Sequence, residues 1–212
     1  DPDPGEVVET NAHTIAALVE QWGGVASRHS IVTDDEQALR SALSAAADAD
    51  LLVTIGGSSV GRRDLVPDVV ADMGDLPVHG VAIKPGHPVG IGQVEGTPLL
   101  LSPGYPVSTI VCAVQFLRPA VAAAGEFDPP AITTSDATLD RKIPSEPGVR
   151  TFARVAIQAK EATTTADPIR VAGASVLSSV TAADGWVVVP EPVEGYVAGD
   201  TVSVGDWRGA DG

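Results

Sequence analysis

Between residues 1 and 125, apolar positions switch repeatedly between the spacing of a helix and the spacing of a strand. Apolar side chains recur every three to four residues in 11–22 and 34–47, which predicts two helices. A third helix is expected to begin near Asp64, and a long one to cover 106–124. Predicted strands lie between these helices, at 6–9, 25–32, 51–55, 78–84 and 99–102, with a hairpin arm at 89–95.

The run at 51–55 is almost entirely apolar, which is typical of a strand buried on both faces of a parallel sheet. Helices and strands that alternate along a chain fold as α/β layers. We therefore predict an α/β domain over residues 1–127, a doubly wound three-layer sandwich with a mostly parallel sheet. Sites in such folds lie at the carboxyl ends of the strands.

The pattern changes after Gly125. Residues 126–130 read as a linker that ends in two prolines. Beyond the linker, short apolar runs predict strands, at 149–158, 169–171, 186–189 and 201–204. We predict a second, smaller all-β domain over residues 131–208, with a barrel-like form.

The chain has 212 residues, with 28 acidic and 13 basic side chains and a formal net charge of −15. This length is ample for a buried core, which has to be mainly aliphatic because only 4% of the residues are aromatic. Nucleic-acid binding is disfavoured, because that affinity comes chiefly from clustered Lys and Arg. An acidic surface with few lysines is typical of halophilic proteins, and a functional acidic face is the alternative.

The sequence also bears on location. The chain opens without a basic and apolar leader, and its longest near-apolar stretch, 107–117, is far shorter than the ~20 residues that span a bilayer. The single cysteine, Cys112, excludes an internal disulfide and is expected to be a small buried hydrophobic residue. We therefore expect a cytoplasmic protein with no membrane segment. Because the chain lacks an initiating Met, we expect it to be part of a longer protein.

Three loops rich in glycine or proline follow three predicted strands. The first reads Gly56-Gly57-Ser58-Ser59-Val60-Gly61. Its glycines let backbone N–H groups approach an anion, and the helix start that follows favours negative charge. The other two loops, 85–89 and 103–107, share the pattern Pro-Gly-x-Pro-Val. They are either simple turns or, since each follows a strand, walls of the same crevice.

Charged residues stand beside these loops. Lys84 precedes the second loop directly, where it can hold an anionic ligand, and His87 adds a charge that depends on pH. Glu9 and Asp64 end the first strand and the first loop, and two carboxylates with substrate phosphates suit Mg²⁺. The alternative interpretations are structural: an N-cap for Asp64, a surface position for Glu9 and an exposed loop histidine for His87.

Four motifs carry a family resemblance: Gly5-Glu6-Val7-Val8-Glu9-Thr10-Asn11, Gly56 to Gly61 with Asp64, Lys84-Pro85-Gly86-His87-Pro88, and Pro103-Gly104-Tyr105-Pro106-Val107-Ser108. Each motif is weak alone, but their order and spacing together resemble the MoeA family of molybdopterin molybdenumtransferases, also called the gephyrin E-domain family. The β segment, with Phe152-Ala153-Arg154, resembles the C-terminal domain of that family. The resemblance covers residues 5–205 and lacks the two N-terminal domains of the family.

The resemblance implies an enzyme that takes adenylylated molybdopterin and molybdate, cleaves the adenylate with Mg²⁺ and releases AMP, and inserts molybdenum. It also implies a homodimer for the full-length protein. The implied substrate-binding residues are Thr10, Asn11, Gly56, Gly57, Ser58, Ser59, Gly61, Pro103, Gly104 and Ser108. The implied molybdate-binding residues are Lys84, His87, Arg154 and Ser175, and Asp64 and Glu9 are implied to act catalytically at the Mg²⁺.

The sequence departs from the family pattern at three positions. His87 replaces a lysine, and a neutral imidazole with an ordinary pKa of ~6.5 weakens oxyanion binding near neutral pH. Tyr105 replaces an asparagine, and Arg62 replaces a glutamate. Two alternative functions stay open. One is a non-catalytic molybdopterin-binding module, and the other is a nucleotide pyrophosphatase of the competence-damage type, which lacks the β domain.

The halophile hypothesis predicts that salt stabilises the chain. Mutual repulsion among the excess carboxylates opposes the compact state, and salt screens that repulsion. We expect the melting temperature to rise between dilute buffer and molar KCl in thermal melts. An unchanged melting temperature would contradict the hypothesis.

Overall fold

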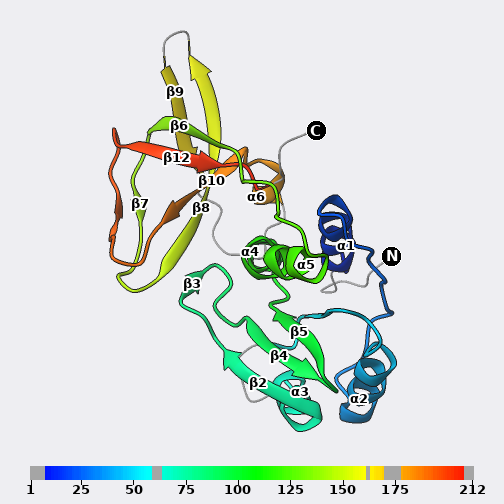
Figure 1. The fold of residues 1–212 in the computed structure, drawn as a ribbon. Helices are drawn as coiled ribbons and strands as arrows, with labels where there is room; N and C mark the ends of the chain where they lie inside the picture. The colour runs from blue at the N-terminus through cyan, green and yellow to red at the C-terminus, as the bar shows by residue number, and fades with distance from the viewer. Residues whose placement is uncertain (1–7, 59–63, 161–162, 170–177, 208–212) are drawn as a thin grey trace. The chain divides into compact units, whose positions relative to one another are not determined.

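The computed structural model describes residues 8–58, 64–160, 163–169 and 178–207 (Figure 1). The chain divides into two compact units. The first unit takes in Asp1–Gly80, Pro88–Gly104 and Cys112–Pro129, and the second takes in Val81–His87, Tyr105–Val111 and Pro130–Gly212. Two short stretches of the predicted first domain, 81–87 and 105–111, therefore group with the second unit.

The first unit is an α/β structure, as predicted. Its elements are α1 (Asn11–Gln21), α2 (Glu36–Ala45), β1 (Leu52–Ile55), α3 (Val66–Met73), β2 (Gly74–His79), β4 (Gly90–Val94), β5 (Thr97–Ser102), the π-helical η1 (Ala113–Leu117) and α5 (Arg118–Ala124). The strands form one sheet in the order β1-β5-β4-β2. Only the β1–β5 pair is parallel among these described strands.

The expected mostly parallel sheet is therefore wrong for the described strands, and the reason is local. Residues 89–95 form a hairpin arm, as predicted, and β4 is joined to β5 by the two-residue turn Glu95-Gly96. Both turn residues have positive φ, 52° and 90°, which is typical of a tight hairpin turn. A turn of this kind can connect only antiparallel strands.

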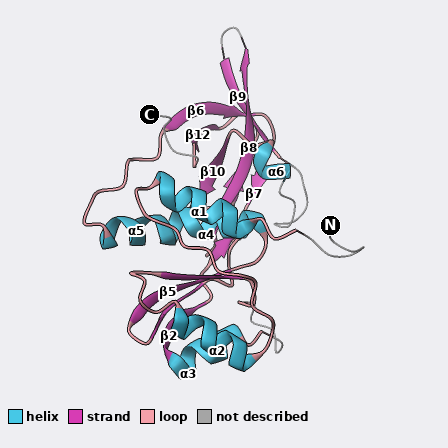
Figure 2. Cartoon of the chain, turned by 90° about the vertical axis from the view of Figure 1, so that its right-hand side faces the viewer, coloured by secondary structure: helices cyan, strands magenta, loops and turns pink. Residues whose placement is uncertain are grey.

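One face of this sheet is covered by α2 and α3 (Figure 2). The core between them is aliphatic and consists of Leu43, Leu52, Val66, Val69, Val70, Val94, Leu99 and Leu101. The helix α2 begins after Asp35, whose carboxylate accepts a hydrogen bond from the Ala38 N–H at 2.8 Å. Such a side-chain cap satisfies one of the backbone donors at a helix start.

One predicted strand is not found, and a second is not found in its described half. Residues 25–32 form no strand, and Val25 and Ile31 are 96% and 80% exposed. Within the predicted strand 6–9, residues 8 and 9 are irregular, and the rest lies outside the described residues. The described sheet ends at β1, which pairs only with β5 in the part of the chain that is described. Burial on both faces was also expected for this strand, yet only Leu52 is fully buried, because β1 is an edge strand.

The long helix predicted at 106–124 is confirmed as α4 (Pro106–Cys112) followed by η1 and α5. By length and composition this run could cross a membrane, but 61% of its most apolar window is buried, which is typical of a core helix. Cys112 is fully buried, as predicted, and burial raises the pKa of its thiol to about 12. This thiol is therefore protonated at neutral pH.

The second unit is built around a closed sheet. Its elements are β3 (Ile83–Lys84), β6 (Thr134–Leu139), β7 (Ile143–Pro144), β8 (Arg150–Lys160), β9 (Thr163–Pro168), α6 (Ser178–Thr181), β10 (Gly185–Val189), β11 (Gly195–Tyr196) and β12 (Thr201–Gly205). The strand order is β10-β12-β6-β9-β8-β3, and pairing of β10 with β8 closes the barrel. The prediction of a barrel-like β domain is confirmed.

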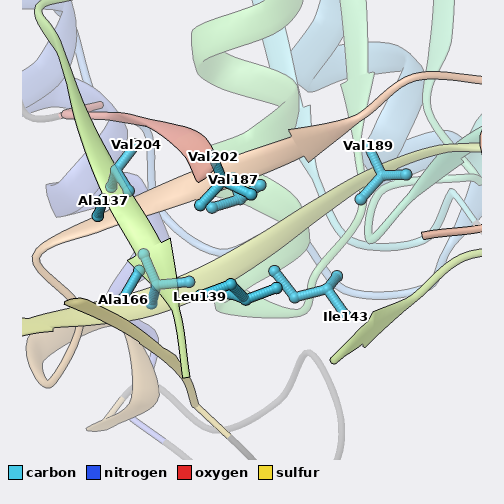
Figure 3. Close-up of a cluster of buried hydrophobic side chains, with 9 residues drawn as sticks. Ala137, Leu139, Ile143, Ala166, Val187, Val189, Val202 and Val204 are labelled. Carbon is cyan, nitrogen blue, oxygen red and sulfur yellow. The ribbon is translucent and has the colours of Figure 1, made fainter. Parts of the chain in front are cut away.

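The barrel has a compact aliphatic core, shown in Figure 3. Leu139, Val155, Val187 and Val189 at its centre are each at most 1% exposed. The strands predicted at 149–158, 186–189 and 201–204 correspond to β8, β10 and β12. The strand predicted at 169–171 is wrong at residue 169, because β9 ends at Pro168, and the remainder lies outside the described residues.

Truncation of the barrel core provides a test of this packing. Leu139→Ala leaves a cavity, and substitutions of this kind cost about 2–5 kcal/mol. We expect that loss in the free energy of unfolding, measured by urea denaturation. Val197→Ala is the control, because this side chain is 64% exposed and its truncation should change stability by less than about 0.5 kcal/mol. Equal losses in the two variants would contradict the assigned core.

Candidate functional site

In the first unit, the loops that follow β1 and β5 lie against each other. The Gly56 N–H donates to the Ser102 carbonyl at 2.9 Å. A methyl group added at Gly104 would stand 3.2 Å from the Gly56 Cα, so only small residues allow this approach. Gly56 and Gly57 also have φ of 87° and 63°, a backbone conformation that favours glycine. Two of the three predicted loops therefore converge at the carboxyl ends of parallel strands.

The start of α1 reaches the same place. Asn11 donates from its side-chain amide to the Gly104 carbonyl at 2.8 Å. Nearby in the chain, the Glu9 carboxylate accepts the Ala12 N–H at 2.9 Å. Glu9 thus caps the first turn of α1, while Thr10 makes no capping bond through its side chain. The predicted substrate-binding group of Asn11, Gly56 and Gly104 is brought together, and Glu9 has a structural task.

The first glycine loop is held by a residue that the sequence did not single out. Ser58 is 2% exposed, and its carbonyl lies 2.9 Å from His79 Nε2. A carbonyl can only accept, so this nitrogen carries the proton and donates. Ser59 and Gly61 lie outside the described residues. No sequence signal pointed to His79, because it follows no motif and ends the edge strand β2.

Asp64 does not stand at the N-cap position that its structural interpretation predicted. The helix α3 begins at Val66 with Leu65 as its N-cap, so the start predicted near Asp64 is two residues early. Asp64 is therefore not the N-cap of this helix, and it stays a candidate for chemistry. Pro103 is buried beside Gly104, and Ser108 is 4% exposed within α4, where it groups with the second unit.

The other candidates form a second group, which lies within the second unit. The short strand β3 pairs in parallel with β8, with Lys84 opposite Thr151. A hydrogen bond of 2.9 Å from the Arg150 N–H to the Ala82 carbonyl extends this pairing. Arg154 also lies on β8, three residues after Thr151. Lys84, His87 and Arg154 thus belong to one structural unit, whereas Ser175 lies outside the described residues.

The loop after β3 is closed by His87. Its Nδ1 lies 2.8 Å from the Val81 carbonyl, and its own carbonyl accepts the Val81 N–H at 2.9 Å. Since the carbonyl of Val81 can only accept, Nδ1 carries the proton and Nε2 of the neutral ring is an acceptor. An acceptor nitrogen repels an oxyanion, whereas the protonated ring attracts it.

The two permanent cations of this group, Lys84 and Arg154, have different partners. Lys84 Nζ pairs with Glu146 Oε1 at 2.8 Å, and this ammonium lowers the pKa of the Glu146 carboxyl. Arg154 is half-buried and donates to the Ser179 hydroxyl, and burial lowers the pKa of its guanidinium. Among the described residues, no carboxylate lies within ion-pair distance of Arg154. A desolvated cation with a neutral partner favours the arrival of an anion.

The described residues hold no group of three or more His, Cys, Asp or Glu side chains that could bind a metal ion. Mg²⁺ does not require such a cage, because it commonly binds through one or two carboxylates plus substrate phosphates. Asp64 and Glu9 are the two carboxylates that the sequence predicts for this role, and the Glu9 carboxylate accepts a backbone N–H.

Comparisons with known proteins agree with this geometry. Residues 3–123 match the family described as a probable molybdopterin binding domain, and residues 136–207 match the MoeA C-terminal region, domain IV. The chain thus consists of an α/β domain of the first family followed by a MoeA-type β domain. It belongs to the MoeA family.

Relatives match nearly the whole chain. Molybdopterin molybdenumtransferase 2 of Mycobacterium tuberculosis is 32% identical over 212 residues, which cover 96% of this chain and 51% of the relative. The crystal structure of the molybdopterin biosynthesis MoeA protein of Pyrococcus horikoshii is 29% identical, with a TM-score of 0.82, and the match covers 99% of this chain and 50% of that one. A molybdenum cofactor biosynthesis protein of Pyrococcus furiosus gives a TM-score of 0.75 at 28% identity, over 93% of this chain and 64% of the other. The chain spans about half the length of the curated relatives it matches.

The contact between Asn11 and Gly104 generates a stability prediction. Asn11→Ala removes one hydrogen bond to the third loop, which we expect to cost about 0.5–1.5 kcal/mol in unfolding free energy. Glu20→Ala, an exposed change on the same helix, is the control. If both variants unfold at the same urea concentration, the contact does not hold the loop.

Proposed function

We propose that this chain supplies the molybdopterin-binding and oxyanion-binding parts of an enzyme that inserts molybdenum into molybdopterin. The substrates are adenylylated molybdopterin and molybdate, and the adenylate leaves as AMP. The observation that carries the proposal is the match to the two family models in order, over 3–123 and 136–207. Convergence of the predicted loops within the first unit supports it.

The first unit is proposed to bind the phosphate-bearing end of the pterin. The paired loops at Gly56 and Gly104 present backbone at the carboxyl ends of β1 and β5, where α/β folds bind ligands. Backbone N–H groups in glycine-rich turns bind phosphate oxygens without a side chain in the way. Asn11 fixes the third loop from the side of α1. These groups bind and orient the substrate, and none of them needs to change its protonation state.

The second unit is proposed to bind molybdate. Lys84 on β3 and Arg154 on β8, the strand that pairs with β3, are proposed to supply the positive charges, and molybdate is a tetrahedral dianion at neutral pH. His87 adds a third charge only when its ring is protonated, which favours molybdate binding at acidic pH.

Magnesium is proposed to act with Asp64 and Glu9, of which Glu9 also caps α1. When bound, Mg²⁺ would neutralise charge on the phosphates of the substrate during release of AMP. Asp64 would hold the ion beside those phosphates. A cytoplasmic location and a homodimer of a longer protein remain part of the proposal.

One alternative is a non-catalytic molybdopterin-binding module. Binding of molybdopterin in calorimetry without turnover of adenylylated molybdopterin would support the module. The second alternative is the pyrophosphatase of the competence-damage type, which hydrolyses ADP-ribose or NAD derivatives. The match of 136–207 to the MoeA C-terminal region supports the molybdenum branch over it.

Asp64→Asn separates catalysis from binding. The amide keeps the size of the side chain but removes its charge, so we expect turnover of adenylylated molybdopterin with Mg²⁺ to be lost. Molybdopterin binding should stay within about tenfold, which corresponds to ~1.4 kcal/mol. Asp68→Asn, in the first turn of α3, is the matched control and should keep the unmodified rate. Unchanged turnover in the Asp64 variant would remove Asp64 from the mechanism.

A further inference from the structure

The cation assigned to molybdate is already in contact with an acid of its own chain. Glu146 lies in the turn between β7 and β8, and its carboxylate pairs with Lys84 across 62 residues of sequence. Both residues belong to the second unit. The carboxylate presents an oxygen and a negative charge to the ammonium, as an oxyanion does.

The turn that carries Glu146 is well fixed. The Val149 N–H donates to the Glu146 carbonyl at 3.1 Å, and the Gly148 N–H donates to the Glu191 carbonyl at 2.7 Å. Ser145 donates its N–H to the Glu194 carbonyl at 2.8 Å, and its hydroxyl lies 2.7 Å from that of Thr151. Thr151 is also the register partner of Lys84. The backbone therefore delivers Glu146 to Lys84, and only the side chain has to move to release it.

We infer that Glu146 is an internal competitor for the oxyanion: its carboxylate occupies Lys84 until molybdate displaces it, and it thereby sets the affinity of the site. This inference rests on the proposed function, which assigns Lys84 to molybdate. Displacement is feasible because the side chains of Lys84 and Glu146 are 61% and 70% exposed. Ion pairs of such exposure are weak, and a dianion interacts more strongly with the ammonium than a single carboxylate does.

Glu146 also makes the site selective for the charge of the anion. A singly charged anion replaces Glu146 without electrostatic gain, whereas a dianion adds one negative charge beside Lys84. Glu146 therefore discriminates against monovalent anions such as chloride. In an anionic protein that is expected to work in salt, this discrimination would keep Lys84 available for a dianion.

The matched control is Glu191. It forms the ion pair Glu191–Arg150 on the same barrel, with 3.0 Å between Arg150 Nε and Glu191 Oε1, and both partners are 45% exposed. Glu146→Gln and Glu191→Gln therefore remove the same charge from two ion pairs of similar exposure, one at Lys84 and one not. Any effect of overall charge appears in both variants.

The test is equilibrium dialysis of the 212-residue chain against molybdate at low salt, with molybdenum quantified by mass spectrometry. We expect Glu146→Gln to lower the molybdate Kd about three- to fivefold, the range of a weak ion pair. Glu191→Gln should leave the Kd within about 1.5-fold, as should Glu146→Gln in a Lys84→Met background.

The remaining outcomes separate this inference from the proposed function. If molybdate binds in a manner that needs Lys84 and Glu146→Gln leaves the Kd unchanged, the inference fails and the molybdate site stands. An equal gain in Glu191→Gln also overturns the inference, because the effect is then one of overall charge. If no variant binds molybdate, or if binding does not depend on Lys84, both the proposed molybdate site and the inference fail.

Discussion

The pairing of two residues, Ile83 and Lys84, with the start of β8 is the interaction on which the candidate oxyanion site depends. It ties the loop that carries Lys84 and His87 to the barrel that carries Arg154. Parallel pairing fixes which β8 residue stands opposite Lys84, and a shift of one position would turn every side chain of β3 to the other face. The hydrogen bond between Arg150 and Ala82, together with the loop closed at His87 and Val81, holds this short strand in register.

The charge of the chain makes this local arrangement more significant. With a net charge of −15, the protein as a whole repels anions. An anionic substrate therefore binds only where cations are gathered and desolvated. The half-buried Arg154 meets that condition, whereas Lys84 is exposed and becomes available to an anion once Glu146 is displaced. Salt screens the long-range repulsion and leaves the buried charge less affected.

Much of the fold could be predicted from residue patterns, because the helices at 11–22 and 106–124 and the strands β8, β10 and β12 each carry a strong local period. The predictions that failed concern which strands pair and in which direction. Residues 25–32 have a strand-like composition, but no strand lies beside them in the described sheet, and an isolated strand leaves its backbone groups unpaired. The direction of β4 depended on the two-residue turn Glu95-Gly96, whose importance the composition alone did not reveal.

The residues of the candidate site also divide into those that the sequence predicts and those that it does not. Gly56 and Gly104 were predictable because glycine-rich loops after strands meet at one sheet edge, and Asn11 was implied by the family resemblance. His79 and Glu146 were not, because each acts through a contact between distant segments whose register no motif encodes.

The most direct test of the central claim is anomalous diffraction at the molybdenum absorption edge from crystals of the chain soaked in molybdate. The account predicts a molybdenum peak within contact distance of Lys84 Nζ and the Arg154 guanidinium, with the Glu146 carboxylate turned away. A peak elsewhere, with Lys84 still paired to Glu146, would contradict it.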